Sequence, residues 1–219
     1  MSLSSSPKLV KGGLVVLNAA GNAVDRSIAL QYNPDTLTRS FQVQGAGGEG
    51  GGERATPFRL KGPAIETLKV EAEIDATDGL EFPDQNPKVA ALGIGPQLAL
   101  LEGLVNPRSE ALATLNAQAN SGVLEIVPPE APLVLFVWGR QTVVPVRVTD
   151  LSITEEAFDP ALNPLRAKVS LGLRVMSSDD LGFAHRGGAL FLAHLKRREQ
   201  LAGQVDAATL SSLGLAGLP

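Results

Sequence analysis

Two stretches alternate strictly between apolar and polar residues, and this period of two constrains the fold more than any other feature. In the segment 67–75 the apolar set is Leu68, Val70, Ala72 and Ile74, and the polar set is Lys69, Glu71, Glu73 and Asp75. In the segment 166–176 the apolar set is Ala167, Val169, Leu171, Leu173 and Val175, and the polar set is Arg166, Lys168, Ser170 and Arg174. Successive side chains of a strand point to opposite faces, so both segments are predicted to be half-buried strands.

Other apolar or alternating runs predict further strands at 14–17, 27–32, 36–43, 54–60, 133–138, 141–149 and 151–158. The run 133–138 is almost wholly apolar and ends in Trp138, which we expect to be buried. Gly139–Arg140 predicts a tight hairpin turn, and the segment 159–165 predicts another. Pro145 lacks a backbone N–H, so it indicates a sheet edge or a bulge.

Helical segments are predicted between and after the strands. Pro87 suits a first helical turn, and the helix after it is expected to be divided near Gly93, Gly95 and Pro96. A second short helix is expected at about 108–118, whereas 76–86 is expected to be a loop. Near the C-terminus, 188–202 predicts a helix with Phe191, Leu195, Leu201 and Ala202 on one side.

The predicted fold class is mainly β, of the α+β type: a β-barrel or sandwich with a helical insert and a C-terminal helix. We expect residues 1–180 to form the β domain, with the helical insert at about 86–118. Residues 181–219 are expected to form a C-terminal helix and a docking tail that needs a partner for order. Two β blocks separated by helices favour one barrel or sandwich over two domains.

Composition excludes several function classes. The 219 residues carry a net charge of -4 and no cysteine, so a general nucleic-acid binder, a disulfide framework and a thiolate zinc site are not expected. The first residues lack a secretory pattern, and no apolar run reaches about 18 residues. We therefore expect a protein made in the cytoplasm that does not insert into a membrane.

A glycine-rich stretch at 45–52 contains the spacing G-x-G-x-x-G at Gly45, Gly47 and Gly50. A dinucleotide site needs a helix directly after that spacing, but the residues that follow predict a strand. The stretch is therefore interpreted as a flexible hairpin loop, and no cofactor is predicted.

Candidate catalytic and metal-binding residues are few. His185 and His194 are nine residues apart, which is not a metal-pair spacing, so His185 is expected in a loop and His194 on a solvent-facing helix position. The row of Glu71, Glu73 and Asp75 could serve acid–base chemistry. It is more simply a solvated face that pairs across strands with bases such as Arg166, Lys168 and Arg174, or an interface between copies.

A short basic cluster, Lys196–Arg197–Arg198, lies near the end of the predicted C-terminal helix. Cations are favoured there by the helix dipole, and three charges followed by Glu199 are too few for a nucleic-acid patch. No nucleic-acid partner is predicted.

Three stretches in this order resemble one family: QYNPDTLTRSF at 31–41, KGPAIETLKVEAEIDATD at 61–78, and LVLFVWGR at 133–140 followed by VRVTDLSITEEAFDPALNPLRAKVSLGL at 146–173. The chain resembles the tube-like domain of baseplate proteins from phage-tail-like contractile injection systems, over about residues 10–176. Such proteins often continue into a peptidoglycan-binding LysM module. No LysM-like pattern follows residue 176, so peptidoglycan binding is not carried over.

The resemblance implies a β-barrel related to the inner-tube rings, placed between the spike complex and the first tube ring, in a six-fold ring. The implied partners are further copies, the inner tube protein, spike or hub proteins and baseplate proteins, inside a particle that is kept or released. No enzymatic activity is implied. The candidate subunit-contact residues are Gly45, Gly47, Gly48, Gly50, Arg166, Lys168, Arg174, Lys196, Arg197 and Arg198.

Two other readings stay open. One is a β-sandwich module that binds a ligand or a carbohydrate, although Tyr32 and Trp138 are the chain's single Tyr and Trp and sugar platforms usually use more aromatics. The other is an enzyme of a type that no motif identifies.

Overall fold

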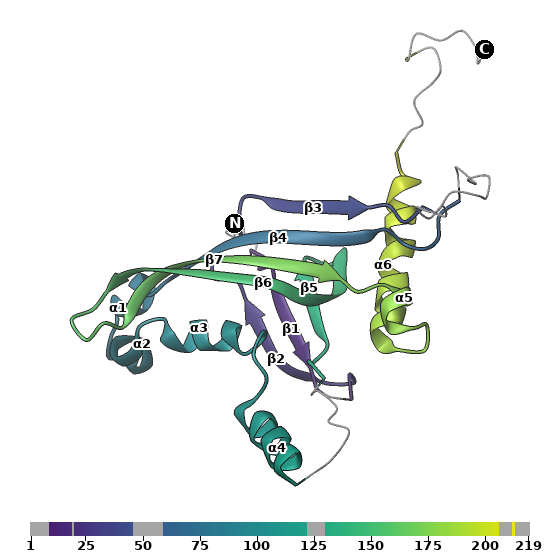
Figure 1. The fold of residues 1–219 in the computed structure, drawn as a ribbon. Coiled ribbons are helices and arrows are strands. Elements are labelled where there is room, and N and C mark those ends of the chain that lie inside the picture. The colour runs from purple at the N-terminus through teal and green to yellow at the C-terminus, as the bar shows by residue number, and fades with distance from the viewer. Residues whose placement is uncertain (1–8, 19, 46–58, 122–129, 206–211, 213–219) are drawn as a thin grey trace.

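One antiparallel sheet of seven strands forms the frame of the protein, in the order β2-β1-β5-β6-β7-β4-β3 (Figure 1). The computed structural model describes residues 9–18, 20–45, 59–121, 130–205 and 212. The strands are β1 (Gly13–Leu17), β2 (Val24–Ala29), β3 (Leu37–Gln42), β4 (Ile65–Asp75), β5 (Val134–Trp138), β6 (Thr142–Phe158) and β7 (Pro164–Val175). Strands β2 and β3 are the outer strands of this sheet.

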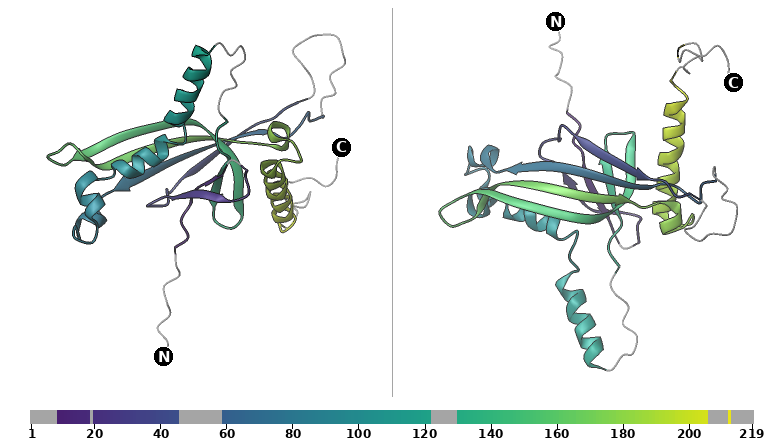
Figure 2. Two further views of the ribbon diagram at one scale, coloured as in Figure 1. Left: turned by 90° about the horizontal axis from the view of Figure 1, so that it is seen from below. Right: turned by 45° about the horizontal axis from the view of Figure 1, so that its top comes forward.

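The sheet curls so that its two halves share one hydrophobic core. Strands β3, β4, β7 and β6 run side by side as a long layer, and β1 and β2 cross beneath it (Figures 1 and 2). Leu14 and Val16 from β1 consequently belong to the same buried cluster as Leu68 and Val70 from β4. The predicted class, mainly β with added helices, is confirmed.

The alternation that dominates the sequence is the pattern of burial in β4 and β7. Ala167, Val169 and Leu171 of β7 are at most 2% exposed, and Lys168, between the first two, is exposed. In β4 the predicted apolar residues point inward, but so does Glu66, which is buried near the beginning of that strand. The core face of β4 is therefore polar at that end.

Among the described residues, six helices occupy the two ends of the sheet and one position away from it. They are α1 (Thr77–Leu80), α2 (Pro87–Leu92), α3 (Gly95–Glu102), α4 (Ser109–Asn120), α5 (Ser178–Leu181) and α6 (Arg186–Ala202). Helices α1 to α3 lie at the far end of the β6–β7 hairpin, and α5 and α6 lie at the opposite end (Figures 1 and 2). Helix α4 buries none of its residues.

Several helix predictions hold in detail. Helix α2 begins at Pro87, and the chain between α2 and α3 turns at Gly93, whose φ is 55°. A Cβ at Gly93 would lie 2.1 Å from the carbonyl oxygen of Pro164, so a glycine is needed for the close approach of α2 to β7. The predicted helix at 108–118 corresponds to α4.

Some boundaries differ from the prediction. The strand expected at 27–32 is β2, which runs from Val24 to Ala29, and the two strands expected at 141–149 and 151–158 are the single strand β6. The loop expected at 76–86 contains α1. Most of the strand expected at 54–60 lies outside the described residues.

Pro145 lies inside the sheet, in β6 between β5 and β7, and not in an outer strand. Its carbonyl oxygen accepts a hydrogen bond from the backbone N–H of Met176, one residue beyond the end of β7. In antiparallel pairing the N–H and C=O of one residue point to the same side, so the missing N–H faces the place where β7 ends. The predicted edge is wrong for the strand as a whole, but the physical reason for it holds at this one position.

Two predicted exposures are wrong. His194 is 4% exposed, whereas Leu195 beside it is 41% exposed, so α6 is rotated relative to the predicted apolar side. Its buried face consists of Gly187, Gly188, Phe191 and His194. Trp138, expected to be buried, is only partly buried, and its ring stacks on Phe136 with centroids 5.9 Å apart.

Candidate assembly surfaces

Two side-chain amides after β2 bind backbone groups of other segments, and the Gln31 bonds to Asp75, here called the amide clasp, join the two halves of the curled sheet. Gln31, which follows β2, donates from Nε2 to the carbonyl oxygen of Asp75 and accepts at Oε1 from the backbone N–H of Asp75, both at 2.9 Å. The amide thus takes the place of a neighbouring strand at the last residue of β4. Asn33 acts in the same way on the chain before β1, since Oδ1 accepts from Gly12 N–H and Nδ2 donates to the Val10 carbonyl, both at 2.8 Å.

Tyr32 lies between these amides and faces the start of the helical insert. Its hydroxyl is 3.3 Å from a carboxylate oxygen of Asp78 in α1. Burial, together with the negative charge of Asp78, raises the pKa of Tyr32. The segment 31–33, which carried part of the sequence resemblance, therefore joins β1, β4 and α1.

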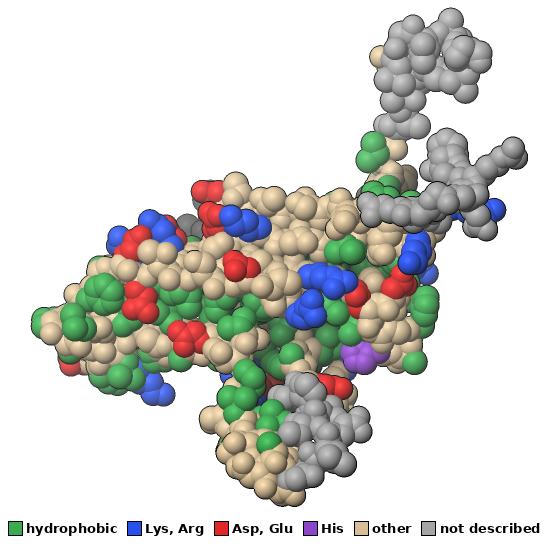
Figure 3. Space-filling view, viewed as in Figure 1, with side chains coloured by type: hydrophobic (Ala, Val, Ile, Leu, Met, Phe, Trp, Pro, Cys, Tyr) green, Lys and Arg blue, Asp and Glu red, His purple; other side chains and the backbone are tan. Residues whose placement is uncertain are grey.

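The outward face of β4, β7 and β6 carries charges of both signs, which Figure 3 shows interspersed over the long layer. Arg166 binds Asp75 at 2.8 Å, so the predicted cross-strand pairing of the acidic row is confirmed for this pair. Lys168 lies opposite Glu73 in register but binds Glu156 at 3.0 Å. Both neighbours raise the pKa of their bases, Asp75 that of Arg166 and Glu156 that of Lys168.

The carboxyl group of Asp75 is held ionised by its surroundings. Hydrogen bonds from the Thr77 hydroxyl and backbone N–H, and then from Arg166, lower the pKa of Asp75. Asp75 also forms the backbone contacts with Gln31, so one residue connects the amide clasp, the charged face and α1.

A hollow lies where this charged face meets the chain between β2 and β3. Its cavity volume is about 610 Å³. It is lined by the loop Tyr32–Thr36 and by outward-facing residues of β4, β6 and β7, among them Glu73, Thr154 and Lys168. The lining is mixed: polar and charged side chains are joined by Pro34, Ala72 and Val169, and Tyr32 is its aromatic residue.

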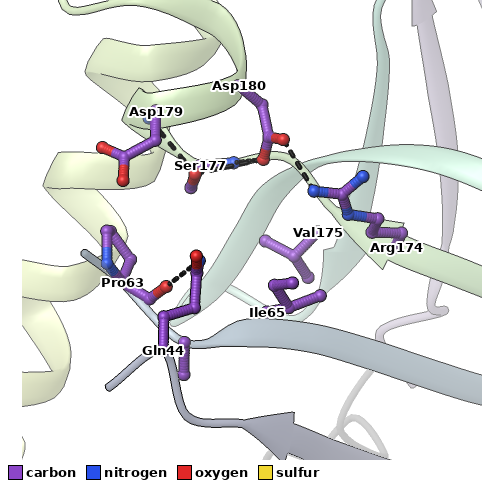
Figure 4. A pocket seen from close by; sticks show the side chains of 9 residues that line it. Gln44, Pro63, Ile65, Arg174, Val175, Ser177, Asp179 and Asp180 are labelled. Carbon is purple, nitrogen blue, oxygen red and sulfur yellow. Dashed lines mark hydrogen bonds and ion pairs between the residues drawn. The ribbon is translucent and has the colours of Figure 1, made fainter. Parts of the chain in front are cut away.

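Arg174 is at the other end of β7 and is separate from the row that contains Arg166 and Lys168. Its guanidinium binds Asp180 of α5 at 2.7 Å, beside a small cavity of about 140 Å³ (Figure 4). Asp180 also accepts from the backbone N–H and the hydroxyl of Ser177, which forms a capping box for α5. Arg174 therefore secures the turn from the sheet into α5.

The far end of the β6–β7 hairpin is a rigid, partly apolar tip. Asp159 accepts hydrogen bonds from the backbone N–H groups of Ala161 and Asn163 and from the Asn163 side chain, at 2.7 to 2.8 Å. Leu162 has a φ of 64° and is 78% exposed, and Phe158 is also exposed. A non-glycine residue with positive φ is strained, so the loop holds Leu162 outward at a conformational cost.

The three residues of the basic cluster of α6 differ in exposure and in contacts. Arg197 is partly buried and donates from Nη1 to the carbonyl oxygens of Arg140 and Gln141 in the β5–β6 turn, at 3.4 and 3.3 Å. Lys196 and Arg198 are exposed and form no ion pair within the described part of the chain. His185 is the N-cap of α6, where its Nδ1 accepts from the backbone N–H of Gly187 at 3.1 Å.

Of the four candidate contact glycines, the structure describes Gly45. Gly45 is exposed and forms an isolated bridge with Leu60, which extends the β3–β4 hairpin. Gly47, Gly48 and Gly50 lie outside the described residues. Next to this bridge, Phe41, Val43 and Leu60 are exposed apolar side chains.

The described residues contain no group of three or more metal-ligand side chains, and none of their helices is long and apolar enough to cross a membrane. The sequence analysis predicted neither the backbone contacts of Gln31 and Asn33 nor the burial of His194. The motif containing Gln31 and Asn33 was visible in the sequence, but their backbone partners lie 44 and 21 residues away.

Comparison with known proteins gives one family. A family model described as "Contractile injection system tube protein" matches residues 15–184, which include every strand from β2 to β7 and all but the first residues of β1. No curated protein matches the chain. Helix α6 lies beyond the matched residues.

Proposed function

The chain belongs to the contractile injection system tube protein family, and on that premise we propose that it is the adaptor ring that starts the inner tube on the spike. Membership supports a structural role in a tail-like particle, in assembly with other tail components. The proposal adds a position, at the spike-proximal end of the tube, and a stoichiometry of six copies.

The observation that carries the proposal is the presence of two different outer strands, β2 and β3, on one sheet. Unpaired strand edges are templates for pairing with another chain. Because the two edges differ, copies would join head to tail, and such a contact closes into a ring when the rotation between neighbours allows it.

The position at the start of the tube is supported by elements outside the sheet, of which α6 lies beyond the family match and α4 lies within it. Helix α6 lies beyond the family match, and α4 stands away from the sheet with no buried residue. A subunit that contacts an unlike neighbour on one side needs surfaces that an ordinary tube ring does not. We assign α4, α6 and the apolar β6–β7 tip to those unlike contacts.

The candidate contact residues divide into two groups under this proposal. Arg166, Lys168 and Arg174 already have carboxylate partners within the chain, so they would contact a neighbour only through their exposed edges. Lys196 and Arg198 have charges to offer, and Arg197 would orient them through its hold on the β5–β6 turn. The glycine stretch around Gly45, Gly47, Gly48 and Gly50 is proposed to order on docking.

A labelling experiment on particles separates the adaptor from an ordinary tube subunit. A small epitope at the C-terminus is introduced in the native host, and purified particles are imaged with gold-labelled antibody. Label at the spike-proximal end of each tube supports the adaptor. Label along the whole tube would keep the family role and refute the position, and native mass spectrometry of the isolated ring tests the six copies against the 22.8 kDa chain mass.

The hollow beside Tyr32 keeps one alternative testable. Its mixed lining combines hydrogen-bonding side chains with one aromatic residue, Tyr32, which a small sugar could use. Saturable binding of a soluble oligosaccharide that is lost in Tyr32→Ala, by a chain that enters no particle, would favour a carbohydrate-binding module over the tube adaptor.

A further inference from the structure

His194 is a buried histidine whose imidazole is incompletely satisfied. It is 4% exposed, and its Nδ1 has no hydrogen-bond partner within the described residues. A buried polar atom without a partner is uncommon in folded proteins and calls for a physical explanation. The chain contains one other histidine, His185, which is exposed at the beginning of the same helix.

A partly buried ion pair of the sheet lies near enough to His194 to act on its charge. Arg39 of β3 binds Glu66 of β4 at 2.7 Å, and Glu66 is 7% exposed. The guanidinium of Arg39 also lies over the ring of Phe41, 5.1 Å from its centroid. Both Glu66 and Arg39 act electrostatically on His194, while α6 itself packs on β6 and α5.

The charges around the imidazole are unfavourable to a further positive charge. Glu66 is the one carboxylate that acts on it, and Arg39 already occupies that carboxylate. Arg197 and Arg198 of α6 itself add positive charge. The other elements against α6 are α5, whose Asp180 is engaged by Arg174, and β6, whose charged residue nearest the turn, Arg147, is exposed.

Few other contacts hold α6 to the sheet. Phe191 is its one large apolar residue that is fully buried. Gly187 and Gly188 allow a close approach to α5, since a Cβ at Gly188 would lie 2.1 Å from the Gly182 carbonyl. Beyond these, Arg197 holds the β5–β6 turn, and most of the helix surface is exposed.

We propose that α6 is a proton-sensitive clip. It is docked on β6 and α5 while His194 is neutral, and it leaves the sheet when the imidazole takes up a proton. The released helix would leave the buried Glu66 more accessible to water. This property belongs to the isolated chain and does not depend on the proposed place in a particle.

The direction of the pH effect follows from the burial. Burial lowers the pKa of His194. The positive charges of Arg39, Arg198 and Arg197 lower it further, whereas the negative charge of Glu66 raises it. A group whose pKa is lower in the docked state contributes stability that is present above its ordinary pKa of 6.5 and is lost as pH falls. Linkage to one such imidazole can increase the undocking equilibrium by at most about thirtyfold between about pH 7.5 and pH 5.

Hydrogen exchange read by mass spectrometry tests the proposal on the purified full chain. Peptides from α6 and from β7 are compared at about pH 7.5 and pH 5, after correction for the intrinsic pH dependence of exchange. We expect protection of α6 to fall on the order of tenfold while β7 stays protected. The chain's single tryptophan, Trp138, ends the strand before the turn that Arg197 holds, so its fluorescence should change over the same pH range.

Two variants assign the effect to one imidazole. His194→Gln keeps a neutral side chain and should remove the pH dependence, whereas His185→Gln should retain it. Equal protection of α6 at both pH values in the parent, or an unchanged pH dependence in His194→Gln, overturns the proposal. If His194→Gln does not dock α6, an NMR titration of the parent decides: a pKa below that of His185 supports the clip, and equal values refute it. Gold labelling of particles is unaffected by any of these results.

Discussion

The substitution Gln31→Ala removes the amide clasp and leaves every strand and the apolar core in place. Gln31 forms two hydrogen bonds of 2.9 Å with the backbone of Asp75, across 44 residues of sequence. An intramolecular hydrogen bond contributes about 0.5–1.5 kcal/mol, so the expected loss is about 1–3 kcal/mol of unfolding free energy. The clasp is partly buried, and water can reach the freed groups of Asp75 in part, which favours the lower half of that range.

Urea unfolding followed by circular dichroism measures this loss, with an unchanged slope as the sign that the native sheet persists. Gln97→Ala is the matched control, because Gln97 is exposed on α3 and its side chain forms no hydrogen bond among the described residues. Gln31→Glu is the sharper variant. It keeps the acceptor for Asp75 N–H but loses the donor and adds a carboxylate next to Asp75 and Asp78.

The two Gln31 variants should therefore separate with pH. Near neutral pH we expect Gln31→Glu to be at least as unstable as Gln31→Ala, because of charge repulsion. Near pH 4 the new carboxyl group gains a proton, can donate to the Asp75 carbonyl, and should recover part of the loss. The amide clasp would be refuted if Gln31→Ala were as stable as the parent. It would also be refuted if Gln97→Ala lost as much unfolding free energy as Gln31→Ala.

Four further substitutions test the packing and the tip. Leu173→Ala should cost about 2–5 kcal/mol in urea unfolding because Leu173 is fully buried, whereas Leu162→Ala at the exposed tip should change stability by less than about 0.5 kcal/mol; similar losses would contradict the assigned burial. Gly93→Ala should cost more than about 1 kcal/mol, since its φ of 55° and the nearby β7 carbonyl both exclude a Cβ, and a neutral result would show that the α2–α3 turn is different. Hydrogen bonds from the side chain and backbone of Asn163 lower the pKa of Asp159, so protection of the tip should be present above about pH 4 and lost below it; Asp159→Asn should abolish that dependence in hydrogen exchange.

The strands that could be predicted are those whose signal is local. The alternation in β4 and β7 needs no information from elsewhere in the chain, because the side-chain period of a strand is fixed by its backbone. Pro145 shows the limit of local rules. Its missing N–H does face an unpaired side, but that side exists because β7 ends at Val175, which cannot be read from the residues around Pro145.

The burial of His194 could not be predicted for a similar reason. The predicted apolar side of α6 combined Phe191 with Leu195, and a period of 3.6 residues alone would place both against the core. In the structure Phe191 is buried together with His194, which lies within electrostatic reach of Glu66 and Arg39 from strands more than 120 residues earlier. Polar neighbours favour a polar residue at this position, so Leu195 remains partly exposed.

Directional hydrogen bonds such as those of Gln31 determine at which strand edges the sheet can pair with another copy. Apolar packing alone would not determine this. A curled sheet held only by Leu and Val side chains could slide or open, since such contacts have no direction. Strand β3 pairs with β4 only as far as Val70, and beyond it the Gln31 amide occupies the backbone groups of Asp75. An incoming strand at that end of β4 would have to displace the clasp, whereas β2 and β3 present their outer edges with no such block among the described residues. Edge-to-edge contacts between copies should therefore form at β2 and β3, and Gln31→Ala should allow a second, incorrect contact at β4 that appears as aggregation in analytical ultracentrifugation. If the variant loses stability but remains as monodisperse as the parent, the clasp supports the fold without protecting the edge.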